Sequence, residues 1–304
     1  MYVTKPFTVT DANLDASSLA ENDHTAYNGG TAYTVGQKCI STTTHSVYEC
    51  MIDCTGVDPD TDTSDPPKWL RLGATNRWKP FDKIISDPAT SAAQTITYSL
   101  DSFTEPATGL TAFGLYGVSV QLVVTDSIDG EVFNQTVSLV DNRRIINWFD
   151  YFFEPGRYRT EAIFSGIPPY ATATYDLTFT AATGETPEIG QIVLGREYWL
   201  GLTVTGTSIS IADYSIKDRD DFGNAIIVER AFSKRVDFDF AVSTPHANRA
   251  LTLLSEVRAI PAVYSAGSDT EQFGTTVYGF FKDWSISLDG PTISNGTIEV
   301  EGLS

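Results

Sequence analysis

The sequence of 304 residues lacks any apolar run near the ~20 residues that a membrane-spanning helix needs, although hydrophobic residues make up 41% of it. We therefore expect no membrane insertion. The first residues, MYVTKPFTVTDANL, contain neither a basic start nor an apolar stretch, so they predict no secretion signal. We expect the chain to be made in a cytoplasm.

Positive charge is also scarce. The chain has 20 basic residues against 39 acidic ones and a formal net charge of −19. Such a chain repels phosphate backbones, which argues against nucleic acid as a partner.

Histidine, the usual general base, occurs only as His24, His45 and His246. A nucleophilic triad would need one of them beside a serine or cysteine, and no G-x-S-x-G elbow is present. The sequence therefore predicts no acyl-transfer enzyme. A carboxylate pair such as Asp218 with Asp221 would suit glycoside hydrolysis, but charges of this kind are more typical of solvated loops.

Cysteine is limited to Cys39, Cys50 and Cys54. The cluster allows one disulfide, with Cys39 bonded across a hairpin, or three reduced and buried thiols, and a cytoplasmic product favours the thiols. Together with His45 the cysteines have the chemistry of zinc ligands, but their spacing matches no standard pairing of C-x-x-C units. We expect no metal site and no cofactor.

After residue 76, apolar and polar residues alternate with the period of two that is typical of half-buried β-strands. Turn signals such as Asp129-Gly130 and Gly290-Pro291 separate the strands. Many strands at this spacing predict a mainly β fold with one or two antiparallel β-sandwiches. The apolar faces of three expected strands are Val118, Val120, Leu122 and Val124; Tyr175, Leu177 and Phe179; and Val236, Phe238, Phe240 and Val242.

One short helix is expected near the C-terminal end of the chain. Thr244 is its expected N-cap and Pro245 its first helical residue. Leu251, Leu254 and Val257 would form its apolar face, and it would end before the next proline.

Residues 26–75 form a separate aromatic segment with glycine at its turns, AYNGGTAYTVGQKCI, followed by a hairpin, a proline-rich loop and Trp69. Over residues 26–73 this order resembles the small carbohydrate-binding modules of chitinases and cellulases. The resemblance implies that some rings stack on pyranose sugars and at least one lies in the core. The alternative is a module kept only for structural docking. The candidate sugar-binding rings are Tyr27, Tyr33, Tyr48 and Trp69.

A second resemblance spans nearly the whole chain. Its motifs are TDANL, AEND, ATNRWKPFD, IVLG, DYSIK, FGN, YGFFKDW and a GL end. They resemble structural proteins of the tail tip or baseplate of tailed bacteriophages, of the distal tail type. The resemblance implies a virion protein assembled in the bacterial host cytoplasm. Its implied partners are copies of itself in a homo-oligomeric ring, a hexamer or trimer, and other phage tail proteins.

Two further segments carry alternatives. Asp58, Asp60, Asp62 and Asp65 alternate as Ca²⁺ ligands do, but their loop lacks the central glycine and final glutamate of an EF-hand, so a flexible acidic loop is favoured. Residues 147–159, NWFDYFFEPGRYR, concentrate aromatic side chains. Their density favours core packing at a strand end over an exposed patch for a partner or sugar.

These patterns divide the chain into an N-terminal arm (1–25), a carbohydrate-binding-like domain (26–75) and a β-sandwich assembly region (76–304). Trp78 and Phe81 are expected to anchor the exit of the small domain to the sandwich core. We expect a structural tail component rather than an enzyme, with host-surface glycans as a further partner. The alternative is a carbohydrate-active enzyme or depolymerase with an ancillary sugar-binding domain, which rests on the first 75 residues alone.

Overall fold

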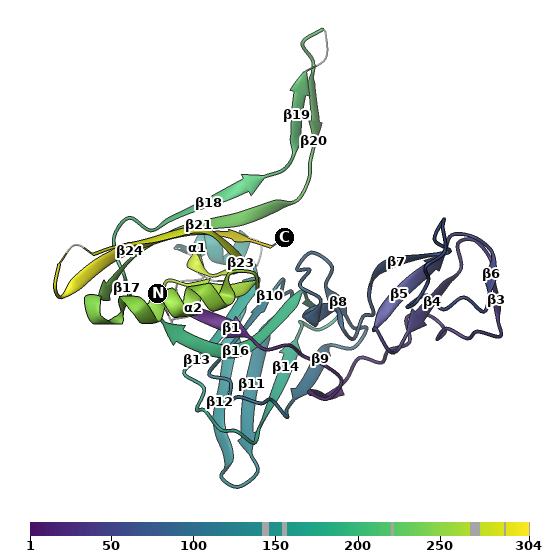
Figure 1. Ribbon diagram of the computed structural model, residues 1–304, viewed down its shortest axis with the longest axis horizontal. Coiled ribbons are helices and arrows are strands. Elements are labelled where there is room, and N and C mark those ends of the chain that lie inside the picture. The colour runs from purple at the N-terminus through teal and green to yellow at the C-terminus, as the bar shows by residue number, and fades with distance from the viewer. Residues whose placement is uncertain (142–145, 154–156, 220–221, 268–273, 289, 304) are drawn as a thin grey trace.

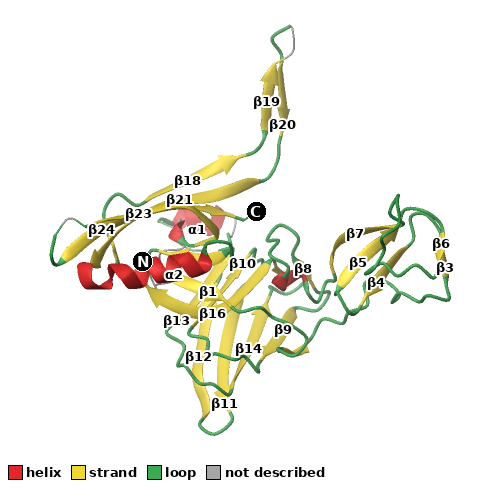
Figure 2. Cartoon of the chain, viewed as in Figure 1, coloured by secondary structure: helices red, strands yellow, loops and turns green. Residues whose placement is uncertain are grey.

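The computed structural model describes residues 1–141, 146–153, 157–219, 222–267, 274–288 and 290–303. Two antiparallel sheets form the body of the molecule, and residues 26–75 form a small β module at one side (Figures 1 and 2). This confirms the predicted mainly β class with a small hairpin module and sandwich-like packing.

The larger sheet contains ten strands and curls so that its two ends contribute to different cores. All its pairings are antiparallel, and β18 pairs with β21 beside β17. In spatial order nine of the strands are β13 (Glu161–Ser165), β10 (Gly109–Phe113), β16 (Gln191–Trp199), β1 (Tyr2–Pro6), β22 (Ala262–Ser265), β23 (Val277–Ser287), β24 (Ile293–Gly302), β21 (Phe232–Ser243) and β17 (Leu202–Thr203). The tenth strand, β18 (Ser208–Asp213), also pairs with β21.

The second sheet has five strands and packs against the β13, β10 and β16 end of the first. The predicted alternation holds on its inner strand β11 (Ser119–Asp126), where Val120, Leu122 and Val124 are buried. Apolar faces from both sheets meet here and form the first core. In spatial order the strands are β12 (Gly130–Ser138), β11 (Ser119–Asp126), β14 (Ala173–Thr180), β9 (Thr95–Leu100) and β2 (Leu14–Ser17).

The helix α2 (Ala247–Val257) packs on the other end of the large sheet and forms the second core. It follows a 3₁₀ turn, η2 (Thr244–His246), so it begins later than expected. Thr244 does not cap the helix, because its hydroxyl donates to the Gly290 carbonyl. The expected apolar face was also wrong at Leu251, which is 49% exposed. The buried positions are Ala250, Leu253, Leu254 and Val257.

The first 25 residues do not form a separate arm. Strand β1 lies between β16 and β22 in the large sheet, and β2 is an edge strand of the second sheet. Val3 is fully buried, so this segment belongs to the cores that were assigned to residues 76–304.

The small module contains a three-stranded sheet and a two-stranded sheet. The chain leaves it through a single 3₁₀ turn, η1 (Lys79–Phe81), and enters the body at β8 (Ala89–Thr90), which pairs with β15 (Glu188–Ile189). The module's strands are β3 (Ala32–Tyr33), β4 (Lys38–Ser41), β5 (Ser46–Cys50), β6 (Cys54–Thr55) and β7 (Trp69–Ala74).

Two elements project from the body. β19 (Ile216–Arg219) and β20 (Ala225–Val228) continue the β18–β21 hairpin and stand away from the sheets (Figure 1). A short helix, α1 (Trp148–Phe153), lies between β12 and β13 in the sequence. In the described part of the chain, no helix is long and apolar enough to cross a membrane.

Candidate functional site

The aromatic rings of the small module pack against one another. The ring centroids of Tyr33 and Trp69 lie 5.0 Å apart in an edge-on arrangement, and Tyr27 stacks on Tyr33 at 5.7 Å. The Tyr33 hydroxyl accepts a hydrogen bond from the backbone N–H of Asn28, and Trp69 Nε1 donates to the Val57 carbonyl. These contacts satisfy the polar atoms of the two rings inside the module.

Of the four rings expected to bind sugar, only Tyr27 is half-buried rather than buried. Tyr33, Tyr48 and Trp69 are 8%, 7% and 6% exposed. This burial corrects the expectation for these three rings, because a pyranose stacks only on a ring face that it can reach. A module of this size has few apolar residues, so its aromatic rings serve as its own core.

Cys39, Cys50 and Cys54 are buried free thiols in the same core, which agrees with the reduced alternative. Burial raises the pKa of the Cys39 thiol to about 11, so this thiol stays protonated at neutral pH. His45 lies in the turn between β4 and β5, outside this core. The four residues with zinc-ligand chemistry therefore do not converge.

The acidic loop DPDTDTSD uses its carboxylates to brace the module. Asp60 accepts hydrogen bonds from two hydroxyls of the β4–β5 hairpin at 2.5 and 2.8 Å. Asp62 accepts from the backbone N–H groups of Ser64, Lys68 and Trp69. The Ser64 side chain and these amides lower the pKa of Asp62 to about 2. In the described part of the chain, no group of three or more His, Cys, Asp or Glu residues is placed to hold a metal ion.

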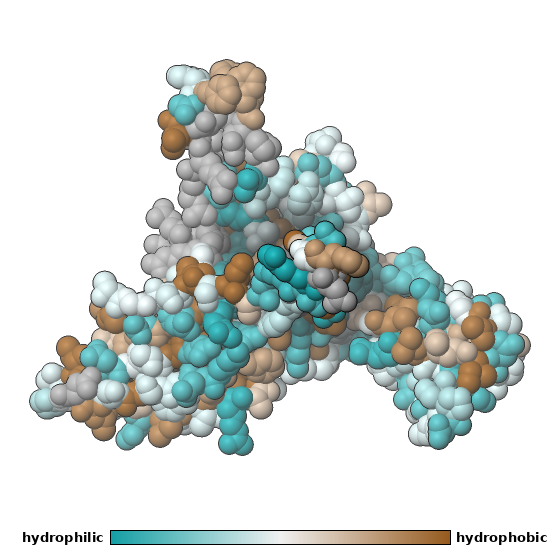
Figure 3. Space-filling model, turned by 90° about the horizontal axis from the view of Figure 1, so that it is seen from above, coloured by the Kyte–Doolittle hydropathy of each residue, from teal (hydrophilic) through white to brown (hydrophobic). Residues whose placement is uncertain are grey.

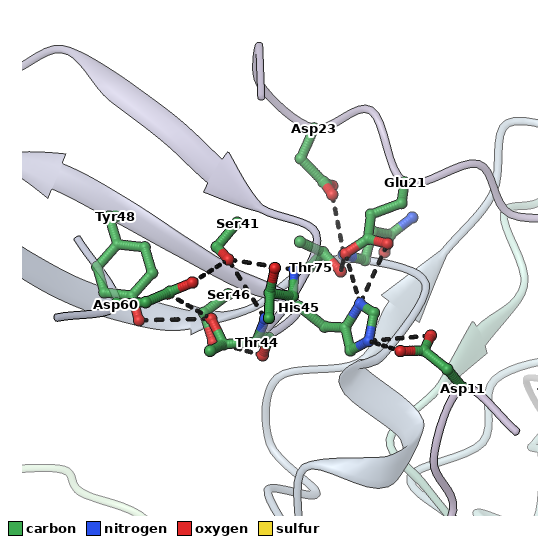
Figure 4. A network of polar contacts seen from close by, with 12 residues as sticks. Asp11, Glu21, Asp23, Ser41, Thr44, His45, Ser46, Tyr48, Asp60 and Thr75 are labelled. Carbon is green, nitrogen blue, oxygen red and sulfur yellow. Dashed lines mark hydrogen bonds and ion pairs between the residues drawn. The ribbon is translucent and has the colours of Figure 1, made fainter. Parts of the chain in front are cut away.

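His45 joins three segments where the module meets the body (Figure 4). Its Nδ1 lies 3.1 Å from Glu21 Oε1, and its Nε2 lies 3.1 Å from Asp11 Oδ1. Thr75 Oγ1 donates to the same Glu21 oxygen at 2.9 Å, and the Thr75 N–H donates to the His45 carbonyl. Because both imidazole nitrogens face carboxylates, the imidazolium is the form that donates in both directions.

Trp78 and Phe81 lie directly behind this network. Trp78 is 7% exposed and belongs to the first core, with Phe81 edge-on to it at 6.0 Å between ring centroids. Phe81 in turn meets Tyr98 of β9 edge-on at 5.6 Å. The two expected anchors therefore pack into the body, and Trp78 contacts the module through His45.

A cavity of about 340 Å³ opens beside His45 and Trp78, between the module and the body. The N-terminal segment contributes Asp11 to its wall, β7 contributes Arg71, and the residue after η1 is Asp82. The sequence motifs that contain Asp11 and Asp82 gave no sign that these residues meet, since the cavity's residues come from three separate parts of the chain. Only the docking of the module onto the body brings them together.

The Asp82 carboxylate has one unsatisfied oxygen. Its Oδ1 accepts a hydrogen bond from the Ile84 N–H at 2.8 Å, whereas its Oδ2 is buried and has no hydrogen-bond partner among the described residues. Burial raises the pKa of Asp82 to about 6. The charge of Asp87 adds to this rise, and the charges of Lys79 and Arg71 oppose it.

Within residues 147–159 the aromatic side chains of α1 are exposed, so the prediction of core packing was wrong for them. The five aromatic side chains of α1 are each 61–77% exposed and contact mainly one another, as Phe149 and Phe153 do at 4.8 Å between ring centroids. Aromatic residues occupy five of the six positions of α1, so no single face of the helix could bury them all. The segment's residues 154–156 lie outside the described residues.

The carboxylate pair considered for glycoside hydrolysis is described only in part. Asp218 lies exposed on β19, and Asp221 lies outside the described residues.

Comparison with models of protein families, with curated proteins and with solved structures finds no match to this chain.

Proposed function

We propose that this protein is a structural component of a phage tail tip or baseplate that assembles with copies of itself. The phage-tail part of the proposal is supported by the sequence motifs, and the self-assembly part is supported by the hairpin extension, defined as the described parts of residues 208–235. Its outer strands β19 and β20 pair only with each other in the described part of the chain. A lone two-stranded hairpin is marginally stable in water, so such an extension is stabilised mainly by a partner.

The outer part of the extension has one apolar face. The strand register places Ile216 opposite Val228 and Asp218 opposite Ile226, so the three apolar side chains share a face. The side chains of Ile216, Val228 and Ile226 are 41%, 46% and 49% exposed. Figure 3 looks down on the extension and shows hydrophobic side chains beside hydrophilic ones at its surface. Exposed apolar clusters of this kind mark interaction surfaces.

The helix α1 supplies a second apolar surface on a different element. Two unlike surfaces on one chain suit a head-to-tail interface, in which one surface of each copy contacts a different surface of the next. Such an interface closes into a ring when the rotation between copies allows it. A trimer or hexamer that also binds other tail proteins is the assembly we propose, located in the virion and formed in the host cytoplasm.

Native mass spectrometry of the purified full-length chain tests this proposal. We expect a closed trimer or hexamer in equilibrium with little monomer. A chain that stays monomeric at every concentration, and also when mixed with the other tail proteins, would contradict it.

Contact with host-surface glycans is proposed as an additional role and rests on the resemblance of residues 26–73 to small carbohydrate-binding modules. The alternative, a carbohydrate-active enzyme or depolymerase, would need a second carboxylate near Asp218. No second observation in the described residues favours that alternative.

A further inference from the structure

We infer that the cavity between the module and the body binds a neutral pyranose residue of a glycan, with Asp82 and Arg71 as its hydrogen-bonding groups. The inference deepens the glycan-contact part of the proposed function. It moves the contact from the buried rings of the module to the junction, and it does not depend on how the chain assembles.

The size and lining of the cavity suit a small polar ligand with an apolar face. Its volume of about 340 Å³ lies within the range of ligand sites in proteins. Trp78, Phe81 and Val9 form its apolar part. A sugar ring presents C–H groups that pack on such a surface and hydroxyl groups at its rim.

The strongest sign of a ligand is the orphaned oxygen of Asp82. A buried carboxylate oxygen without a donor is costly, and its cost is relieved by a ligand hydroxyl that donates to it. Arg71 supplies complementary donors. Its Nε donates to Ser46 Oγ at 2.9 Å, and its other guanidinium N–H groups have no partner among the described residues. Asp82 and Arg71 both line the cavity, so residues with an acceptor and with several donors contribute to one site.

The balance of charge selects against ionic ligands. Asp11 and Asp82 line the cavity together with Arg71 and His45, and Glu21 lies behind His45. A phosphate or sulfate would meet two carboxylates, and an amine would meet a guanidinium. A neutral ligand that both donates and accepts hydrogen bonds suits all four groups.

The cavity is held open by contacts that do not need the ligand. Glu21 and Asp11 fix the His45 imidazole, and Trp78 packs against it. This arrangement fixes the position of β7, and with it Arg71, relative to Asp82 before any ligand arrives. Preorganisation of this kind lowers the entropic cost of binding.

The test is ligand binding by the full-length chain, measured by saturation-transfer NMR and by calorimetry. The probes are methyl β-D-glucopyranoside and N-acetyl-D-glucosamine, with glucose 6-phosphate, glucosamine and glycine as charged comparisons. We expect millimolar binding of a neutral sugar, and at least about tenfold weaker binding in Asp82→Asn and in Arg71→Gln.

Asp87→Asn is the matched control, because it makes the same change on the same segment outside the cavity. It should bind as the unchanged chain does. Absence of saturable binding of both neutral sugars, preference for a charged probe, or binding indifferent to both Asp82→Asn and Arg71→Gln would each overturn the inference. Asp82→Asn removes a buried charge and keeps the side-chain shape, so it should fold. The oligomer measurement remains a separate test of assembly.

Discussion

The imidazole of His45 lies parallel to the indole of Trp78, with ring centroids 4.0 Å apart and an angle of 18° between the planes. His45 belongs to the hairpin turn of the module, and Trp78 belongs to the core of the body. The junction between the two is therefore a packed interface rather than a flexible linker. The same His45 imidazole makes the contacts with the carboxylates of Glu21 and Asp11 and the stacking contact with Trp78.

Trp78→Ala should destabilise the body and loosen the module. Removing a buried aromatic side chain costs ~3–5 kcal/mol, which is a large share of the stability of a domain. Thermal or denaturant unfolding of the purified variant measures this loss.

Ile128→Ala is the control, since it deletes an apolar side chain that is 87% exposed and lies outside both the hairpin extension and α1. Its unfolding transition should match that of the unchanged chain. Equal stability of Trp78→Ala and the unchanged chain would mean that the junction adds nothing to the fold.

The strands were predictable from the sequence because the alternation of apolar and polar residues is visible within each strand. Val236, Phe238, Phe240 and Val242 are buried on β21 as their spacing indicates. The period-two pattern depends only on which sheet face is covered, so it can be read without knowing the partner strand.

The site was not predictable, because its residues meet only through long-range docking. Asp11 lies in the TDANL motif and Asp82 in the ATNRWKPFD motif, but nothing local places either of them beside Arg71. The prediction that Tyr33, Tyr48 and Trp69 bind sugar was wrong for a different reason. The spacing of Tyr33 in the sequence is the same whether its ring faces a sugar or the core of a small domain. Which of the two the ring faces depends on how much other apolar surface the domain contains.

Asp62→Ala should destabilise the small module. It removes an acceptor for three backbone N–H groups and leaves them to find water, with an expected loss of ~1–2 kcal/mol for a partly exposed group. The pKa of Asp62 is lowered to about 2, so its contribution is complete above the ordinary carboxyl pKa near 4 and is lost as pH falls toward 2. Amide hydrogen exchange of residues 64–69 reports the change locally.

Asp65→Ala removes the same charge from the same loop at an exposed position. The exchange rates in this control should stay near those of the unchanged chain. If both variants accelerate exchange equally, charge rather than hydrogen bonding sets the stability of the loop.

Asp82→Asn should stabilise the chain at neutral pH. The folded pKa of Asp82, about 6, lies above its ordinary value, so the folded state holds the proton more tightly. This group therefore destabilises the fold increasingly as pH rises from about 4 to 6, and by a constant amount above that. After allowance for partial exposure we expect a gain of ~1 kcal/mol for the variant at pH 7 and little difference at pH 4.

Paired unfolding curves of the variant and the unchanged chain at several pH values measure this difference. Asp87→Asn, which changes an exposed carboxylate paired with Lys79, should shift stability by less than about 0.5 kcal/mol at every pH. A pH-independent gain in Asp82→Asn would show that the carboxylate is already neutral or already hydrogen-bonded by solvent.

Ile226→Asp should break the proposed assembly without unfolding the chain. Ile226 is half exposed on the apolar face of the hairpin extension and lies outside both cores of the body. A new carboxylate there costs little in a free subunit. In an interface it would be desolvated without a partner, which weakens association at least about 100-fold. Native mass spectrometry should then show monomers, and the thermal transition of the body should be unchanged.

Ile128→Asp is the control, because it makes the same change at a site 87% exposed on the β11–β12 turn. It should leave the oligomer intact, since that turn is remote in the sequence from the extension and from α1. An oligomer that persists in Ile226→Asp as it does in Ile128→Asp would exclude the extension as the contact between copies.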